Sequence, residues 1–253
     1  TANAIHPFAF LGEVATPFGI AVVHSCFNVA ATLVLLPFSN GLVKLACLTL
    51  PTHEDVKEMS ETDKTLSLLD SRFLDTPAYA VEQSRQVASV MADKSRKAMD
   101  LAMELLQGYD EAKAEQVAQM ETDVDRFEDE LGTYLVKLSS RQLSGKDSET
   151  LNTILHCIGD FERISDHARN VKEAAQEMYE KKLDFSDKAQ EELKVFERAV
   201  HDILDITMNS FIKGDLNLAR QVEPMEEVID GLSLDVKQRH VRRLRKGKCT
   251  IEL

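Results

Sequence analysis

The stretch DFERISDHARN, Asp160 to Asn170, lies within a long run of helical periodicity. In a helix it places Glu162 and Asp166 one turn apart on the same face. Two like charges at this spacing destabilise an isolated helix by about 0.2–0.5 kcal/mol. The pair therefore needs an explanation beyond helix propensity: a bound cation, basic neighbours or full solvation.

Two more Glu-x-x-x-Asp pairs have the same spacing, Glu121 with Asp125 and Glu226 with Asp230. The Glu121 pair and the Glu162 pair each border an apolar stripe on their helix. Packing those two stripes together would therefore bring four carboxylates to one edge of a helical bundle. The four are Glu121, Asp125, Glu162 and Asp166.

The acidic pairs have two interpretations. Carboxylate clusters suit hard or borderline cations, so a divalent metal or iron at all six side chains is one of them. The other is a solvated acidic face, neutralised by its neighbours Arg126, Arg163 and Arg169. A ferritin-like di-iron bundle is excluded, because it requires Glu-x-x-His on two helices and none of the seven histidines has a Glu three residues before it.

The composition predicts an all-α protein, since the 253 residues include only 10 Gly, 6 Pro and no Trp. The net charge is −13, yet residues 1–52 contain a single acid, Glu13, and a single base, Lys44. The four cysteines are far apart and form no CxxC, which is typical of a reducing compartment. The chain begins within apolar sequence with no basic n-region, which indicates a piece of a longer protein rather than a signal peptide.

Helical periodicity predicts three long helices that form a first bundle over 78–183, with short connections between antiparallel neighbours. The pattern then repeats at a shift of 105 residues, which superposes Glu121 on Glu226 and Asp125 on Asp230. Residues 184–253 would thus be a second, incomplete bundle, whose third helix would lie past Leu253. The expected helices are 78–106, 110–142, 148–182, 187–212 and 215–244.

The first fifth of the chain predicts a membrane segment. No charged residue occurs from Ile20 to Leu36, and about 20 apolar residues suffice to cross a bilayer, so Gly19–Phe38 is long enough. The alternative is a buried core helix. Basic residues follow the segment and none precedes Lys44, so the part after about residue 52 is expected in the cytoplasm. Residues 1–52 would be the transmembrane segment and 53–77 a linker.

Catalysis and nucleic-acid binding are not expected. We find no nucleophile elbow, glycine-rich phosphate loop or plausible triad, so the sequence indicates no enzyme. The basic run Arg239–Lys248 could attract an anionic surface, but it also suits the C-terminal end of a solvated helix. The acidic remainder disfavours nucleic acid as a partner.

ERISDHARN, the acidic pairs and the repeat of about 100 residues resemble the PhoU family of phosphate regulators. HSCFNVAATLVLLPF (His24–Phe38) followed by LLDSRFLDTPAYA (Leu68–Ala80) is similar to bacterial sodium/phosphate cotransporters that end in a PhoU-like domain. His24 and Asn28 match the membrane motif of that family. The Gln-Ser-Ser-type motifs that build the cotransporter's substrate site are not present, and Ser165 stands where the family usually has Gly.

The resemblance implies two three-helix bundles with acidic metal-binding motifs, on the cytoplasmic side of the inner membrane. It implies the C-terminal portion of a sodium-dependent phosphate symporter, in which the bundle regulates or senses, sodium is the coupling ion, and phosphate binds outside this segment. Membrane lipid and a second copy of the chain are the other expected partners. The alternative function is a membrane-tethered regulatory module without transport activity.

Overall fold

A computed structural model describes residues 17–35 and 59–247 of the chain. The chain divides into two compact units, with the boundary between Glu58 and Met59. Each unit is described by itself. All regular secondary structure in the described ranges is helical, as the composition predicts.

The first unit contains helix α1, Pro17–Leu35, which carries no charged side chain. Large apolar side chains along it are exposed, among them Phe27 and Leu33. Among the residues that the structure describes, no helix is both long and apolar enough to cross a membrane. The crossing predicted over Gly19–Phe38 begins inside α1, while its residues 36–38 and the exit segment up to 52 lie outside the described ranges.

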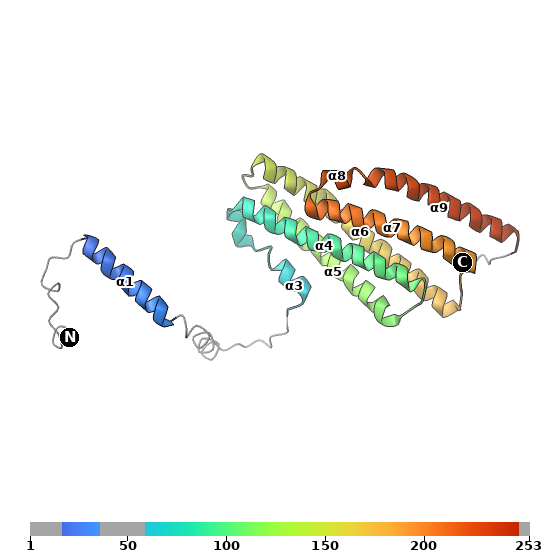
Figure 1. The fold of residues 1–253 in the computed structure, drawn as a ribbon, viewed down its shortest axis with the longest axis horizontal. Coiled ribbons are helices and arrows are strands. Elements are labelled where there is room, and N and C mark those ends of the chain that lie inside the picture. The colour runs from blue at the N-terminus through green and yellow to red at the C-terminus, as the bar shows by residue number, and fades with distance from the viewer. Residues whose placement is uncertain (1–16, 36–58, 248–253) are drawn as a thin grey trace. The chain divides into compact units, whose positions relative to one another are not determined.

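The second unit is built on three long helices, α4 (Pro77–Leu105), α5 (Glu111–Ser139) and α6 (Gly145–Lys181), which pack against one another (Figure 1). These are the three helices that the periodicity predicts. Two of them begin at side-chain caps, because Asp110 accepts a hydrogen bond from the Lys113 amide and Ser144 accepts one from the Asp147 amide. Short connections after α4 and α5 make the neighbours antiparallel.

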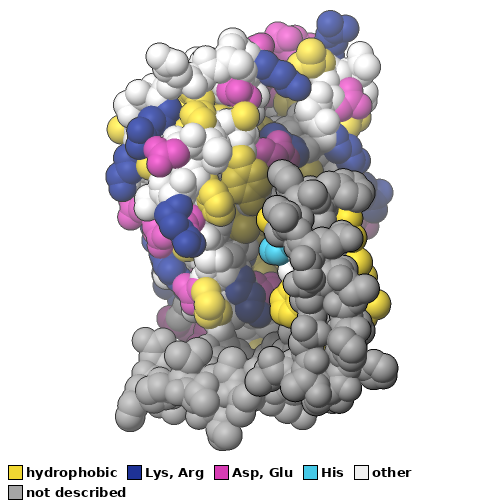
Figure 2. All heavy atoms as spheres, turned by 90° about the vertical axis from the view of Figure 1, so that its left-hand side faces the viewer, with side chains coloured by type: hydrophobic (Ala, Val, Ile, Leu, Met, Phe, Trp, Pro, Cys, Tyr) yellow, Lys and Arg dark blue, Asp and Glu magenta, His cyan; other side chains and the backbone are white. Residues whose placement is uncertain are grey.

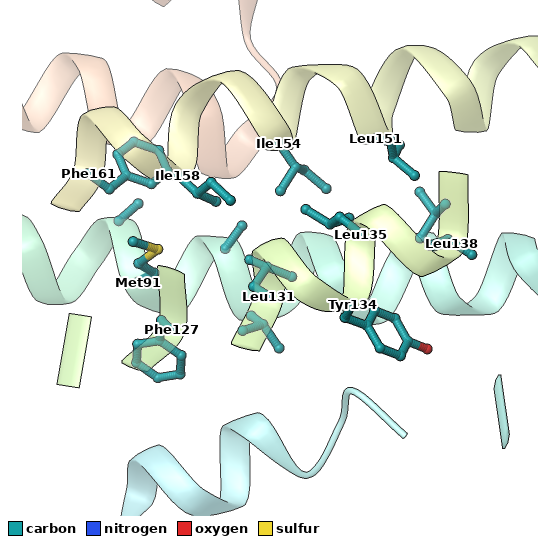
Figure 3. Close-up of a cluster of buried hydrophobic side chains, with 14 of the residues drawn as sticks. Met91, Phe127, Leu131, Tyr134, Leu135, Leu138, Leu151, Ile154, Ile158 and Phe161 are labelled. Atoms are coloured by element: carbon teal, nitrogen blue, oxygen red, sulfur yellow. The ribbon is translucent and has the colours of Figure 1, made fainter. Parts of the chain in front are cut away.

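The core of this bundle is formed by the apolar stripes of the three helices (Figure 3). Phe127, Leu131 and Leu135 on α5 are fully buried against Met91 of α4 and Ile154 of α6. Each such side chain contributes about 1.5–3 kcal/mol by leaving water. The same stripes determine which polar side chains lie at the edges of the bundle.

A short segment before α4 belongs to this core. Helix α3 (Glu61–Leu66) and the 3-10 turn η4 (Ser71–Asp75) pack against α4 and α5, and Thr62, Leu66 and Leu74 are buried there. Tyr134 donates a hydrogen bond to the Asp70 carbonyl, 3.1 Å away. The stretch 53–77, predicted as a linker, thus includes residues that help to form the bundle, and the compact unit begins at Met59.

The second repeat supplies α7 (Asp187–Lys213), α8 (Leu216–Ala219) and α9 (Val222–Arg245). Helix α7 packs on α4, and α9 packs on α7 (Figure 1). The prediction of one unbroken helix over 215–244 is wrong, because the chain turns at Arg220 and Gln221. Pro224 explains the break, since its ring would collide with the Arg220 carbonyl in a continuous helix.

Charged side chains of both signs lie on the surface (Figure 2). On the face drawn in Figure 2, lysine and arginine are interspersed with aspartate and glutamate rather than gathered into patches of one sign. The acidic excess of the sequence is therefore not segregated on that face.

Candidate acidic site on the first bundle

Two of the predicted carboxylates are joined by one arginine. Helix α5 places Glu121 at the border of its buried stripe, where only 6% of the residue is exposed. Helix α6 places Asp166 and Arg169 three residues apart, hence on one face. The Arg169 guanidinium forms an ion pair with Glu121 through Nη1, and its Nη2 lies 3.0 Å from Asp166 Oδ1. The arginine therefore links α5 to α6.

The other two carboxylates of this edge lie within electrostatic reach. Burial raises the pKa of Glu121, and the neighbouring Asp125 raises it further. Burial also raises the pKa of Asp125, with Asp166 as the next cause. The pKa of Glu162 is raised by burial, then by Asp166 and Asp125. Each of these three pKa values is raised in part by another carboxylate of the α5–α6 edge. The structure thus brings together the four carboxylates that the sequence predicts at one edge.

The third acidic pair lies elsewhere. Glu226 and Asp230 project from α9, both are exposed, and α9 packs on α7 and α8. No salt bridge to either side chain is found among the described residues. Equal sequence spacing thus leads to two different environments, one partly buried and one solvated.

The fit of a metal to the α5–α6 edge is mixed. Four carboxylates have the charge and the oxygen donors that a divalent cation requires. However, the Arg169 guanidinium already contacts Glu121 and Asp166. Across the ranges 17–35 and 59–247, no group of three or more His, Cys, Asp or Glu side chains is arranged to hold a metal ion. Metal binding by the six carboxylates stays a prediction.

Polar contacts with α4 and α5, away from the α6 side, tie α3 to the bundle. Asp63 of α3 lies 2.9 Å from the Arg126 guanidinium. Lys94 of α4 donates to Thr62 of α3 at 3.0 Å and to Asp123 of α5 at 2.5 Å. These contacts are not among those predicted from the sequence. Their signal was weak, since it consists of one capped hexapeptide, Glu61–Leu66, before the long helices.

A second polar network joins the two repeats, between α4 and α7. His201 of α7 lies 2.8 Å from Asp100 of α4, and Arg96 bridges Asp100 at 3.1 Å and Asp205 at 3.9 Å. The repeat shift of 105 residues relates Arg96 to His201 and Asp100 to Asp205. The two cross-helix pairs, Arg96–Asp205 and His201–Asp100, are thus equivalent positions of the duplicated sequence.

A buried polar pair lies further along the same α4–α7 contact. Gln107 donates to Glu197 Oε2 at 2.7 Å, while Glu197 Oε1 is buried without a hydrogen-bond partner. Burial raises the pKa of this carboxyl. The contact between the repeats therefore contains two groups, Glu197 and His201, whose charge depends on pH.

His24 and Asn28, the residues that match the membrane motif, lie on α1. They are one turn apart and both are exposed. The Asn28 carbonyl accepts a hydrogen bond from Thr32, 2.8 Å away, within the helix. The Asn28 side chain is thus presented on the surface of α1.

The fold and the acidic edge define a class of protein. Residues 88–175, which run from α4 into α6, match the family model of the PhoU domain. The first bundle is therefore a PhoU domain.

A curated relative supports the same class at low identity. The "Phosphate-specific transport system accessory protein PhoU homolog 1" of Thermotoga maritima is 24% identical over 180 residues, which cover 68% of this chain and 77% of the relative. No solved structure matches the chain. The resemblance to PhoU is confirmed over the first bundle, while the resemblance to a sodium/phosphate cotransporter stays a prediction.

Proposed function

We propose that this chain is the C-terminal portion of a sodium-dependent phosphate symporter, in which the PhoU domain regulates transport. One observation carries the proposal: a PhoU domain and the charge-free apolar helix α1 occur in the same chain. A domain linked to phosphate transport that is covalently attached to a membrane helix would act on a transporter in the same polypeptide. Residues after about 52 would then lie in the cytoplasm, and α1 would contact lipid or other membrane helices.

In this proposal α1 serves as a packing element of the transporter. Exposed aliphatic side chains along α1 suit contact with lipid or with neighbouring helices. The amide of Asn28 suits a hydrogen bond across such a helix pair. Sodium and phosphate would bind in helices outside this segment, so His24 and Asn28 are assigned to helix packing.

The PhoU domain would act through the segment that precedes α4. The Asp63–Arg126 ion pair and the Lys94–Thr62 hydrogen bond hold α3 on the bundle. A rearrangement of α4 or α5 would therefore displace α3, and with it the chain that continues toward residue 58. Loosening α3 should alter regulation and leave the transport chemistry intact.

Phosphate uptake tests the proposal. The parent protein is expressed in cells that lack other phosphate transporters, and labelled phosphate uptake is measured with sodium and with potassium. We expect sodium-dependent uptake. Asp63→Ala should change the response of uptake to the phosphate supply, whereas Asp75→Ala, at an exposed position of η4, should not. No sodium-dependent uptake at normal expression would overturn the proposal.

The name of the relative favours a second candidate function. It describes an accessory protein of a phosphate transport system rather than the transporter itself. In that case the chain would be a membrane-tethered PhoU-type module that acts on a separate phosphate transporter. Uptake by the cells' own transporter would then change when the chain is expressed, and the chain alone would support none.

A further inference from the structure

The acidic edge between α5 and α6 contains a positively charged side chain, Arg169. Four carboxylates gather there, and the one that is most buried, Glu121, has 8% of its side chain exposed. A buried carboxylate is tolerated only when it is neutral or paired. The partner of Glu121 in this structure is the Arg169 guanidinium, which also holds Asp166.

The shape of the guanidinium matters for this contact. Its two Nη groups diverge, so one reaches Glu121 across the helix interface and the other reaches Asp166 on its own helix. Hydrogen bonds between ionised groups are stronger than neutral ones, and the rigid plane of the guanidinium fixes their directions. A lysine ammonium is a compact point charge with rotatable donors, so it would not fix two diverging contacts in the same way.

The position of Arg169 on α6 accounts for its role. It follows Asp166 by three residues and Glu162 by seven, so all three lie in one stripe of the helix. Arg163, which follows Glu162 directly, is rotated by about 100° from it and is exposed. No salt bridge to Arg163 is found in the described part of the chain. Arg169 thus pairs with the carboxylates of the edge, whereas Arg163 is exposed to solvent.

We propose that Arg169 takes the place of a metal ion between α5 and α6, so that the first bundle closes without a divalent cation and becomes cation-dependent when Arg169 is removed. Two of the carboxylates that the sequence predicts as metal ligands, Glu121 and Asp166, are in this chain the partners of one guanidinium. This inference does not depend on the link to phosphate transport.

Competition for oxygen atoms supports the proposal. A divalent cation needs several oxygen ligands at once, and Arg169 occupies Glu121 Oε1 and Asp166 Oδ1. A metal that bound there would displace the guanidinium from both partners. Without the guanidinium, the four carboxylates would repel one another across a partly buried edge, and a metal would then gain the full benefit of relieving that repulsion.

Thermal unfolding and manganese binding of the full chain in detergent test the proposal. Wild type should unfold at the same temperature in EDTA and in manganese(II). Arg169→Gln should unfold at a lower temperature in EDTA and recover in manganese(II). Arg163→Gln is the matched control, since it removes an arginine from the same helix, and it should behave like wild type in both conditions.

Binding of manganese(II), followed by the loss of its free-ion electron paramagnetic resonance signal, gives a second readout. Arg169→Gln should bind at least about tenfold more tightly than wild type, which corresponds to about 1.4 kcal/mol. Arg169→Lys retains the positive charge but loses the planar guanidinium. Its affinity for manganese(II) should therefore lie between those of wild type and Arg169→Gln. Should Arg169→Gln not fold even with manganese(II), the order of Arg169→Lys and wild type still decides the question.

Three results would overturn the proposal. Wild type could bind manganese(II) as tightly as Arg169→Gln, which would mean that metal and arginine share the edge. Arg169→Gln could fold in EDTA with reduced stability and gain none from manganese(II), which would mean that the carboxylates do not form a cation site. It could also keep full stability in EDTA, which would mean that no counter-cation is needed there. Phosphate uptake by the parent protein is independent of all three.

Discussion

The first bundle and the second repeat start from related sequences and bury their residues differently. Val87 and Leu138 are fully buried in the first bundle, whereas the residues 105 positions later are Glu192 and Arg243. These two form an ion pair of 2.6 Å, with 16% and 15% of their side chains exposed. Two apolar core positions of one repeat thus correspond to a largely buried ion pair in the other.

The acidic pairs show the same contrast. Glu121 is buried against α6 and paired with Arg169, while its equivalent Glu226 is exposed on α9. Helix α6 covers the α4–α5 pair, and none of the α9 residues is buried in the part of the chain that the structure describes. The environment of a repeated residue is therefore decided by the helix packed over it, and not by the local pattern.

The largest expected loss of stability comes from truncating a core residue of the first bundle, compared with its equivalent in the second repeat. Phe127→Ala should reduce the free energy of unfolding by about 3–5 kcal/mol, because it leaves a cavity at a fully buried site. The equivalent residue of the second repeat is Leu232, which is only half-buried, so Leu232→Ala should cost less than about 1.5 kcal/mol. Urea unfolding of both variants checks the difference. Equal losses would show that the two repeats are packed alike.

An intermediate effect is expected at the ion pair of the second repeat. Glu192→Val should destabilise by about 1–3 kcal/mol, since it leaves the largely buried Arg243 guanidinium without its partner. Arg243→Leu should cost less, because Glu192 keeps Arg239 at 3.6 Å. The double variant restores the residue types of the first bundle, and it should match wild type or exceed it. A double-mutant cycle measured by urea unfolding distinguishes this outcome from simple addition of the two losses.

The smallest effect concerns pH at the contact between the repeats. The hydrogen bond to Asp100 raises the pKa of His201, with Asp202 and Asp205 acting in the same direction and burial against it. A raised pKa means that the folded state holds the proton more tightly. The stabilisation is therefore complete below the unfolded pKa near 6.5 and is lost as pH rises through the folded pKa. Because 47% of the His201 side chain is exposed, solvent screening limits the loss to below about 1 kcal/mol.

The His201→Arg variant tests that effect, because it introduces the residue that stands at the equivalent position 96. It should remove the contribution of His201, whereas Glu197→Gln removes the separate contribution of the buried carboxyl, whose pKa is also raised. Urea unfolding between about pH 6 and about pH 8 measures the contribution of His201. The contribution of Glu197 is lost as pH rises from the unfolded carboxyl pKa of 4.5 through the raised folded pKa, so its measurement starts below pH 4.5. An unchanged pH profile in His201→Arg would contradict the assignment.

Much of the fold follows from sequence because its signals are local. The ends of α4, α5, α6 and α7 agree with the predicted ranges to within a few residues, since apolar periodicity and turn residues are continuous there. The break before α9 was also accessible, as Pro224 is visible in the sequence. By contrast, burial of Thr62 in α3 depends on a hydrogen bond from Lys94, which no local pattern reveals.

The candidate site was predictable only in part. Helical spacing alone places Glu162 and Asp166 on one face of their helix, and Glu121 and Asp125 on one face of theirs. Which of Arg126, Arg163 and Arg169 neutralises the carboxylates depends on how α6 is rotated against α5. It also depends on the ion pair between Arg126 and Asp63 of α3. The spacing of seven from Glu162 to Arg169 was a usable signal, but the approach of Glu121 from α5 is a property of tertiary packing.

Helix α4 serves both repeats at once. One side of it packs on α5 and α6, and another side meets α7 through Arg96 and Asp100. A substitution in α5 perturbs the copy to which it belongs, whereas a change in the pitch or rotation of α4 must be accommodated by both copies together. The duplicated halves are consequently coupled through the packing of one shared helix, in addition to the chain connection between them.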